Sequence, residues 1–219
     1  MASSVRPGAG RGALLLADIS GYTAFLEAVG GVHREEMRDS GVVPAAYPLM
    51  TSLLDGIVEK LVPPFILSKF EGDAVFAFAP DGELALQGVQ LLACLNACYS
   101  AFLARVADTR ELMWCSCTAC STLNGLDLKF VVHHGEYVAL SIAGHEELLG
   151  PDVTIAHRLM KNHAAALVGA SAYALLTEAA AGHFEAPLEG ALPVTEEYEH
   201  VAPIQAYVFR LDTEQTWSS

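Results

Sequence analysis

The sequence is poor in charge, in basic residues above all, and in long apolar runs. Charged residues make up 17% of the 219 residues, and Lys plus Arg number 12 against 26 Asp plus Glu, which gives a formal net charge of −14 at pH 7. Hydrophobic residues reach 53%, enough for a large core, which argues against disorder. Because a field this negative repels phosphate backbones, we expect no nucleic-acid partner.

No stretch reaches the roughly 20 consecutive apolar residues that a membrane-spanning helix needs. The first apolar run, Ala13–Ala17, is interrupted by Asp18 and is too short for a signal peptide. We therefore expect a cytoplasmic protein without membrane contact, whose five cysteines are thiols or metal ligands rather than disulfides. The length and composition predict a flexible tail over residues 1–11, a single domain over 12–212 and a second tail over 213–219.

Apolar periodicity predicts an α+β fold. Short continuous apolar runs indicate strands, and apolar residues that recur every three to four positions indicate helices. The predicted strands cover residues 13–18, 65–70, 74–79, 126–134, 136–142, 194–201 and 205–211, and the predicted helices cover 22–29, 44–61, 83–106 and 150–162. Glycines mark the expected breaks: Gly30–Gly31 ends the first helix, and Gly135 turns one strand into the next. This order suits an antiparallel sheet with helices on one face.

Two aspartates stand at the ends of apolar segments. Asp18 closes an apolar run within Leu16–Thr23 (LADISGYT), and Asp73 lies in the turn of Lys69–Phe78 (KFEGDAVFAF). A buried, unpaired carboxylate is costly, so Asp18 needs a metal ion, another cation or a helix N-terminus as its partner. Each motif also has a plain structural interpretation, Asp18 as a helix cap and Asp73 as a turn residue beside Gly72.

Taken together, four segments resemble those of the class III adenylate and guanylate cyclases and follow in the same order. They are Leu16–Thr23, Lys69–Phe78, Leu128–Val138 and Gly150–Leu159. The similarity covers most of residues 13–211 and is closest to an uncharacterised bacterial branch of that superfamily. It implies a ferredoxin-like antiparallel sheet and the conversion of a nucleoside triphosphate, ATP in the first instance, to 3′,5′-cyclic nucleotide and pyrophosphate. It also implies a homodimer, with each site formed between two subunits.

The resemblance assigns roles to individual residues. Asp18, Asp73 and the backbone carbonyl of Ile19 match the positions that hold two Mg²⁺ or Mn²⁺ ions in the family, an arrangement that supports phosphoryl chemistry. Lys69 and Glu147 match the positions that select the purine base. In the family, the metal ligands and the base-selecting residues of one site come from different subunits.

The helix segment carries the implied catalytic residues and also the main departures. Arg158 matches the family's charge-stabilising arginine, whereas Thr154 stands where the family usually has Asn. No lysine follows Lys161, so the family's C-terminal triphosphate-binding lysine has no counterpart. Three functions therefore remain open: an active cyclase, a degenerate cyclase-like module that binds a nucleotide or another small ligand, and a metal-stabilised structural or interaction protein.

A cysteine-rich loop over residues 110–124 is the remaining motif. Cys115, Cys117 and Cys120 have a spacing at which thiolates can bind one soft ion such as Zn²⁺. A closed tetrahedral site needs a fourth ligand, and the candidates are Cys94, Cys98, His133, His134 or a residue of a partner chain. A redox pair formed by Cys117 and Cys120, or simply reduced thiols, are the alternatives.

Overall fold

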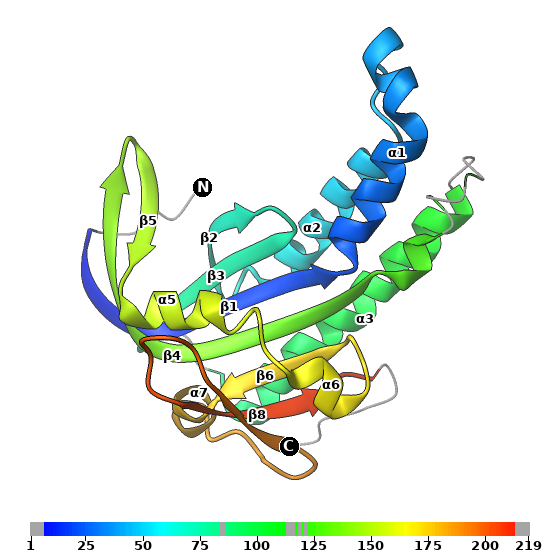
Figure 1. Cartoon of the computed structure of the whole chain (residues 1–219). Helices are drawn as coiled ribbons and strands as arrows, with labels where there is room; N and C mark the ends of the chain where they lie inside the picture. The colour runs from blue at the N-terminus through cyan, green and yellow to red at the C-terminus, as the bar shows by residue number, and fades with distance from the viewer. Residues whose placement is uncertain (1–6, 84–85, 113–116, 118–119, 121, 213–219) are drawn as a thin grey trace.

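The computed structural model describes residues 7–83, 86–112, 117, 120 and 122–212. Its sheet has the strand order β2-β3-β1-β4-β6-β8-β7, with β5 paired to β4 beside this path (Figure 1). The strands are β1 (Gly8–Ser20), β2 (Ile66–Glu71), β3 (Ala74–Pro80), β4 (Asp127–Ile142), β5 (His145–Leu149), β6 (Tyr173–Thr177), β7 (Leu192–Glu196) and β8 (Ile204–Arg210). The helices are α1 (Tyr22–Ser40), α2 (Ala46–Leu61), α3 (Gly88–Leu112), the 3-10 helix η1 (Thr122–Gly125), α5 (Pro151–Arg158), α6 (Ala164–Val168) and α7 (Glu178–His183). Strand β1 begins inside the predicted N-terminal tail, because Gly8 already pairs with Ala139 of β4.

The described strand pairs are antiparallel except for β4 with β6, and this arrangement confirms the predicted α+β class. Strand β1 lies at the centre, between β3 and β4. Its side chains alternate between two apolar clusters, with Leu14 and Leu16 in one and Leu15 and Ile19 in the other. Because both faces are covered, the strand reads as a continuous apolar run.

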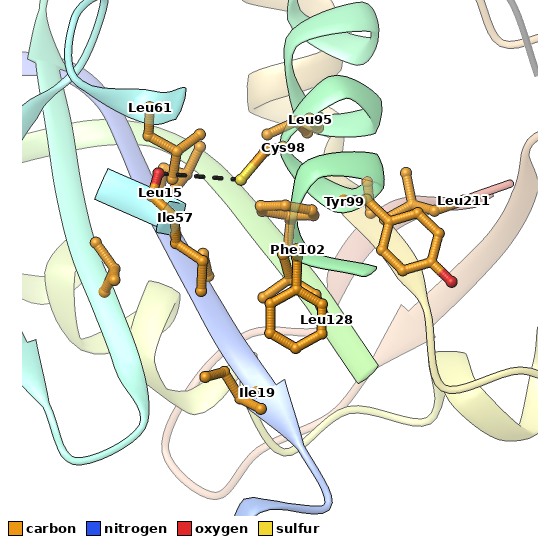
Figure 2. Packing of buried hydrophobic residues seen from close by; sticks show 14 of the residues in the cluster. Leu15, Ile19, Ile57, Leu61, Leu95, Cys98, Tyr99, Phe102, Leu128 and Leu211 are labelled. Carbon is orange, nitrogen blue, oxygen red and sulfur yellow. Dashed lines mark hydrogen bonds between the residues drawn. The ribbon is translucent and has the colours of Figure 1, made fainter. Parts of the chain in front are cut away.

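Helices α2 and α3 cover one face of the sheet, as predicted. Figure 2 shows Ile57 and Leu61 of α2 and Cys98 of α3 packed together over β1. The Cys98 thiol lies 4.0 Å from the Ile57 carbonyl oxygen, and burial raises the pKa of this thiol to about 12. Cys98 is therefore a core residue rather than a metal ligand. The opposite face of the sheet is also covered, because the short helices α5 and α6 pack there against the apolar cluster that contains Leu14 and Leu16.

The predicted hairpin at Gly135 is wrong. Strand β4 runs straight through this residue, and the chain reverses at Ala143–Gly144 instead. A Cβ atom at position 135 would lie 2.4 Å from the Asp152 side chain, so glycine serves close packing against α5 and not a turn. The Asp152 carboxylate uses this approach to accept a hydrogen bond from the Glu136 N–H at 2.7 Å.

The predicted end of the first helix at Gly30–Gly31 is also wrong. Helix α1 continues to Ser40 and stops at Gly41, whose φ of 66° is left-handed. Only Phe25 and Val29 among its residues are buried, so its second half has no apolar face packed on the core. Figure 1 shows this half extending beyond the sheet. Apolar periodicity could not predict it, because no buried side chains repeat there.

Helix α3 is the one helix in the described part of the chain that is long and apolar enough to cross a membrane by length and composition. In its most apolar window, 44% of the residues are buried inside the fold. Leu91, Leu95 and Phe102 belong to the main core cluster. The core helix of a soluble protein has the same hydropathy, so this feature is weak evidence for a membrane span.

Candidate functional site

Two carboxylates from separate parts of the chain meet where β1 ends. Asp18 lies opposite Ala74 of β3, and Asp73 occupies the β2–β3 turn directly before that residue. The turn is held against β1 by a hydrogen bond from the Ile19 N–H to the Asp73 carbonyl oxygen, at 3.3 Å. Burial and, next, the negative charge of Asp18 raise the pKa of the Asp73 carboxyl. These two side chains, which we call the acid pair, are therefore electrostatic neighbours.

A cation from β4 lies against the acid pair. Lys129 Nζ is 2.9 Å from Asp18 Oδ2, and the two side chains are 19% and 17% exposed, so water screens the ion pair poorly. The Lys129 ammonium also donates to the Met160 carbonyl oxygen at 3.4 Å. No sequence motif assigned a role to Lys129, although a lone basic residue in the apolar run Leu128–Val132 is itself a signal that a buried acid lies nearby.

A second charged group lies where β2, β5 and α5 meet. The Lys69 ammonium donates to the Glu147 carboxylate at 2.6 Å and lies 3.2 Å from that of Glu71. The hydrogen bond with Glu147 is the main cause of the raised pKa of Lys69. Glu71 in turn lies 2.9 Å from His157 Nε2. This lysine–glutamate cluster brings the two predicted base-selecting residues together and adds His157, which no sequence motif indicates.

A cleft of about 310 Å³ opens beside the lysine–glutamate cluster, between β2 and the β4–β5 hairpin. Glu147 forms part of its wall, and the neighbouring wall is largely apolar, with Leu67, Phe78, Leu140 and Leu148. A largely apolar cleft with two glutamates, Glu146 and Glu147, in its lining suits a flat ring system that offers a hydrogen-bonding edge.

The two predicted catalytic residues lie on α5 and contact neither charged group of the same chain, as far as the described contacts go. The Thr154 hydroxyl donates back to the Gly150 carbonyl oxygen at 3.1 Å. The Arg158 guanidinium donates to the Glu199 carbonyl oxygen in the β7–β8 connection. Both side chains thus have local backbone partners, which a substrate would have to replace.

The predicted zinc ligands are placed only in part. Cys115 lies outside the described residues. Cys117 and Cys120 lie close together, and the side chain that joins them is His33 of α1, with Nε2 3.4 Å from Cys117 Sγ. None of the four fourth-ligand candidates that the sequence offered belongs to this group. The thiol of Cys94 instead faces the Lys60 carbonyl oxygen at 3.9 Å.

Comparison with known proteins agrees with this architecture. The family model for a protein of unknown function, DUF2652, matches residues 50–167. The uncharacterized protein Rv2561/Rv2562 of Mycobacterium tuberculosis is 28% identical over 167 residues, which are 75% of this chain and 74% of that protein. Among solved structures, the adenylyl cyclase CyaB from P. aeruginosa has a TM-score of 0.65 at 14% identity, with 98% of this chain and 100% of that chain covered. The guanylyl cyclase Cya2 has a TM-score of 0.64 at 13% identity, with 97% and 99% covered.

The match to the family model spans more than half of the chain and includes Asp73, Lys69, Lys129 and Glu147. The structural matches extend over nearly the whole chain, and at such low identity they establish a shared fold rather than a shared activity. The chain therefore belongs to the DUF2652 family of proteins of unknown function, and its fold is that of the class III adenylyl and guanylyl cyclases.

Proposed function

We propose that this chain is a cytoplasmic nucleotidyl cyclase of the class III type. It converts a purine nucleoside triphosphate, ATP in the first instance, to the 3′,5′-cyclic nucleotide and pyrophosphate. The ribose 3′-oxygen forms a bond to the α-phosphorus, the bond to pyrophosphate breaks, and the hydroxyl proton is released. The observation that carries the proposal is the meeting of Asp18 and Asp73 at the end of the central strand, in a fold shared with adenylyl and guanylyl cyclases.

The acid pair has the chemistry to hold Mg²⁺ or Mn²⁺. Both cations prefer oxygen ligands, which Asp18, Asp73 and the Ile19 carbonyl supply. Because burial and the neighbouring charge raise the pKa of Asp73, a cation at this place relieves a repulsion that the fold contains. Two such ions, when bound, neutralise the triphosphate and lower the pKa of the ribose 3′-hydroxyl.

The lysine–glutamate cluster supplies a donor and an acceptor for the purine base. The Lys69 ammonium can donate to a ring nitrogen or carbonyl oxygen of the base, and the Glu147 carboxylate can accept from an amino or imino hydrogen. Both adenine and guanine present such an edge, and the adjoining cleft of about 310 Å³ has apolar walls for the ring. The ion pair between Lys69 and Glu147 holds both groups in one orientation before the base arrives.

A complete site needs a second copy of the chain. Arg158, which would stabilise the charge that develops in the transition state, is on α5 and bonds to the Glu199 carbonyl rather than to the acid pair. We propose a homodimer in which the acid pair of one copy faces Lys69 and Arg158 of the other. The β4–β5 hairpin offers exposed apolar side chains for such contact: Val138, Leu140, Ile142 and Leu149 are 39% to 49% exposed.

The direct test is incubation of the purified chain with ATP or GTP and Mn²⁺, followed by chromatography of the nucleotides. We expect a cyclic product whose rate of formation falls on the order of 10²- to 10³-fold in Asp18→Asn and in Asp73→Asn, as when a single charge-stabilising group is removed. Asp55→Asn, an exposed substitution on α2, is the matched control and should keep the wild-type rate. No cyclic product from either nucleotide would overturn the proposal.

A second candidate is a nucleotide-binding module without turnover. The ion pair between Lys129 and Asp18 favours it, because an ammonium lies where a divalent ion would bind. The absence of any lysine after Lys161 favours it as well, since the triphosphate then loses a counter-charge. This candidate predicts calorimetric binding of ATP or GTP that Asp18→Asn leaves unchanged, together with no cyclic product. Binding that depends on Asp18 would contradict it.

A further inference from the structure

Three side chains connect the second half of α1 with the segment between α3 and η1. His33 comes from α1, and Cys117 and Cys120 come from the segment between α3 and η1. One potential ligand atom from each of these residues lies within 4.8 Å of the other two. His33 Nε2 is 3.4 Å from Cys117 Sγ, and the Cys120 N–H donates to the same sulfur at 3.3 Å. We call these three residues the thiol–imidazole cluster.

The distances match the shape of a metal site. Zinc binds thiolate sulfur at about 2.3 Å and imidazole nitrogen at about 2.0 Å, so neighbouring ligand atoms in a tetrahedral site lie about 3.5 Å apart. The sulfur–nitrogen distance between Cys117 and His33 agrees with this value. The Cys120 N–H donates to Cys117 Sγ at 3.3 Å, so the backbone at the second cysteine already fixes the position of the first sulfur.

The histidine is oriented in the manner of a metal ligand. Its Nδ1 lies 3.3 Å from the Glu36 carboxylate, one turn further along α1, and its Nε2 faces the sulfur. Metal-binding histidines usually donate their second ring N–H to a carboxylate or a carbonyl, which fixes the tautomer and strengthens the ligand. His33 Nδ1 therefore already has the carboxylate partner that is typical of a metal-binding histidine, and Nε2 faces the sulfur that would bind the same ion.

We propose that His33 Nε2, Cys117 Sγ and Cys120 Sγ bind one Zn²⁺ or a similarly thiophilic divalent ion. The ion ties the second half of α1 to the segment that follows α3, and the fourth coordination position is left for water or another donor. This site is separate from the acid pair and does not depend on the proposed nucleotide chemistry.

The proposal explains how the second half of α1 is held. Helix α1 buries only Phe25 and Val29, both before Gly30, so apolar packing does not fix residues 32–40. The helix also passes through two adjacent glycines, each of which lowers helix stability by about 1 kcal/mol relative to alanine. A zinc ion that joins His33 to two cysteines of another segment provides a connection that apolar burial does not.

The test is metal analysis of the full chain, purified without chelators and after removal of any affinity tag. We expect about one zinc per chain, lost in His33→Ala, Cys117→Ser and Cys120→Ser. The matched controls are Cys94→Ser, a half-buried cysteine of α3, and His200→Ala, an exposed histidine; both should keep the metal. Circular dichroism identifies any variant that loses metal because it fails to fold.

Two further measurements on the wild-type chain keep the proposal open to refutation even if a variant does not fold. Replacement of zinc by Co²⁺ should give the visible absorption of a tetrahedral ion with thiolate ligands. Removal of the metal should speed amide hydrogen exchange in residues 32–40 while residues 22–29 stay unchanged. A wild-type chain with no stoichiometric metal and no cobalt spectrum, or one that contains a Cys117–Cys120 disulfide, would overturn the proposal.

Discussion

The acid pair with the adjacent Lys129 and the lysine–glutamate cluster each combine two carboxylates with one lysine. The two groups differ in how many of their carboxylates contact the ammonium. In the cluster, Lys69 lies between two carboxylates, at 2.6 and 3.2 Å, and one of these also has a histidine partner. Beside the acid pair, Lys129 contacts Asp18 and only partly offsets the raised pKa of Asp73, which is caused first by burial and then by the Asp18 charge. Both carboxylates of the first group thus contact an ammonium, whereas among the described contacts only Asp18 of the second group does.

This difference indicates which ligand each group can take. A partly buried carboxylate without an ammonium contact gains free energy from an added cation, so the acid pair is suited to a metal ion. In the cluster, both carboxylates already contact the Lys69 ammonium, so an added cation would have to displace that ammonium. The cluster can instead exchange an internal ion pair for hydrogen bonds to a polar ligand. The two groups should therefore respond differently to the same change of charge.

The largest expected effect is that of Lys129→Glu in the absence of divalent ions. It places a third acid beside Asp18 and Asp73 and should lower the free energy of unfolding by on the order of 3 kcal/mol, as for other broken ion pairs of low exposure. The Tm should fall by about 10 °C, and added Mn²⁺ should restore most of this loss. Lys69→Glu, the same reversal in the cluster, is the comparison; the Lys69 side chain is 33% exposed, so both the loss of stability and the recovery with Mn²⁺ should be smaller. Equal recovery in the two variants would remove the distinction drawn between the groups.

Glu147→Gln should change the choice of nucleotide while the metal requirement stays the same. An amide oxygen still accepts a hydrogen bond but carries no charge, so the hydrogen bond to the base weakens by about 1–1.5 kcal/mol, or roughly 5- to 10-fold in KM. The concentration of Mn²⁺ that gives half-maximal rate should be unchanged, since the acid pair is untouched. The rate assay with ATP and GTP over a range of Mn²⁺ concentrations measures both. A change in the Mn²⁺ dependence alone, with KM for the nucleotides unchanged, would show that Glu147 acts in metal binding rather than in base binding.

The acid pair shows how far the sequence alone could lead. Asp18 and Asp73 each stand at the end of a continuous apolar segment, and such segments form adjacent buried strands. Neither local pattern shows which strands pair, so the proximity of the two carboxylates was implied by the resemblance to the class III cyclases. The apolar repeat of α2 and the β2–β3 hairpin also agree with the structure, since their signals lie within short segments.

Lys129 and His33 show why the rest could not be predicted. Lys129 meets Asp18 only through the antiparallel register of β1 with β4, and that register depends on β4 running through Gly135. His33 meets Cys117 across 84 positions of sequence, from a helix segment that has no apolar repeat. Both wrong predictions took glycine as the end of an element, at Gly135 and at Gly30–Gly31. A glycine that allows close packing, or one that a helix passes through, has no local sequence pattern that distinguishes it from a glycine at a break.

Lys129→Met should tighten the binding of Mn²⁺ to the nucleotide-free protein. The ammonium at 2.9 Å competes with a divalent ion for Asp18, so its removal should lower the apparent Kd about tenfold, equivalent to about 1.4 kcal/mol. Titration calorimetry measures this directly. Lys69→Met removes the same charge from the lysine–glutamate cluster and should leave the Kd for Mn²⁺ as it is. If both substitutions tighten binding alike, net charge rather than the Lys129–Asp18 contact decides the affinity.

The smallest expected effect concerns the stability of the metal-free chain. Burial raises the pKa of Asp73 in the folded state above the ordinary value of about 3.9, so its ionisation favours the unfolded chain. This contribution to stability is fully present below pH 3.9 and is lost as the pH rises through the folded-state pKa. Asp73→Asn cannot ionise, and at neutral pH it should be more stable than the wild type.

Because Asp73 is only partly buried, solvent screening limits the gain to less than about 1 kcal/mol, or about 2–4 °C in Tm. Urea unfolding at pH 7 and near pH 4 measures the difference, which should shrink at the lower pH. Asp55→Asn, on an exposed face of α2, is the matched control for the loss of one carboxylate. If Asp73 lowers the stability of the metal-free chain and bound metal restores that stability, the aspartate serves function rather than folding. Asp73→Asn less stable than the wild type at pH 7 would instead make this aspartate a structural turn residue.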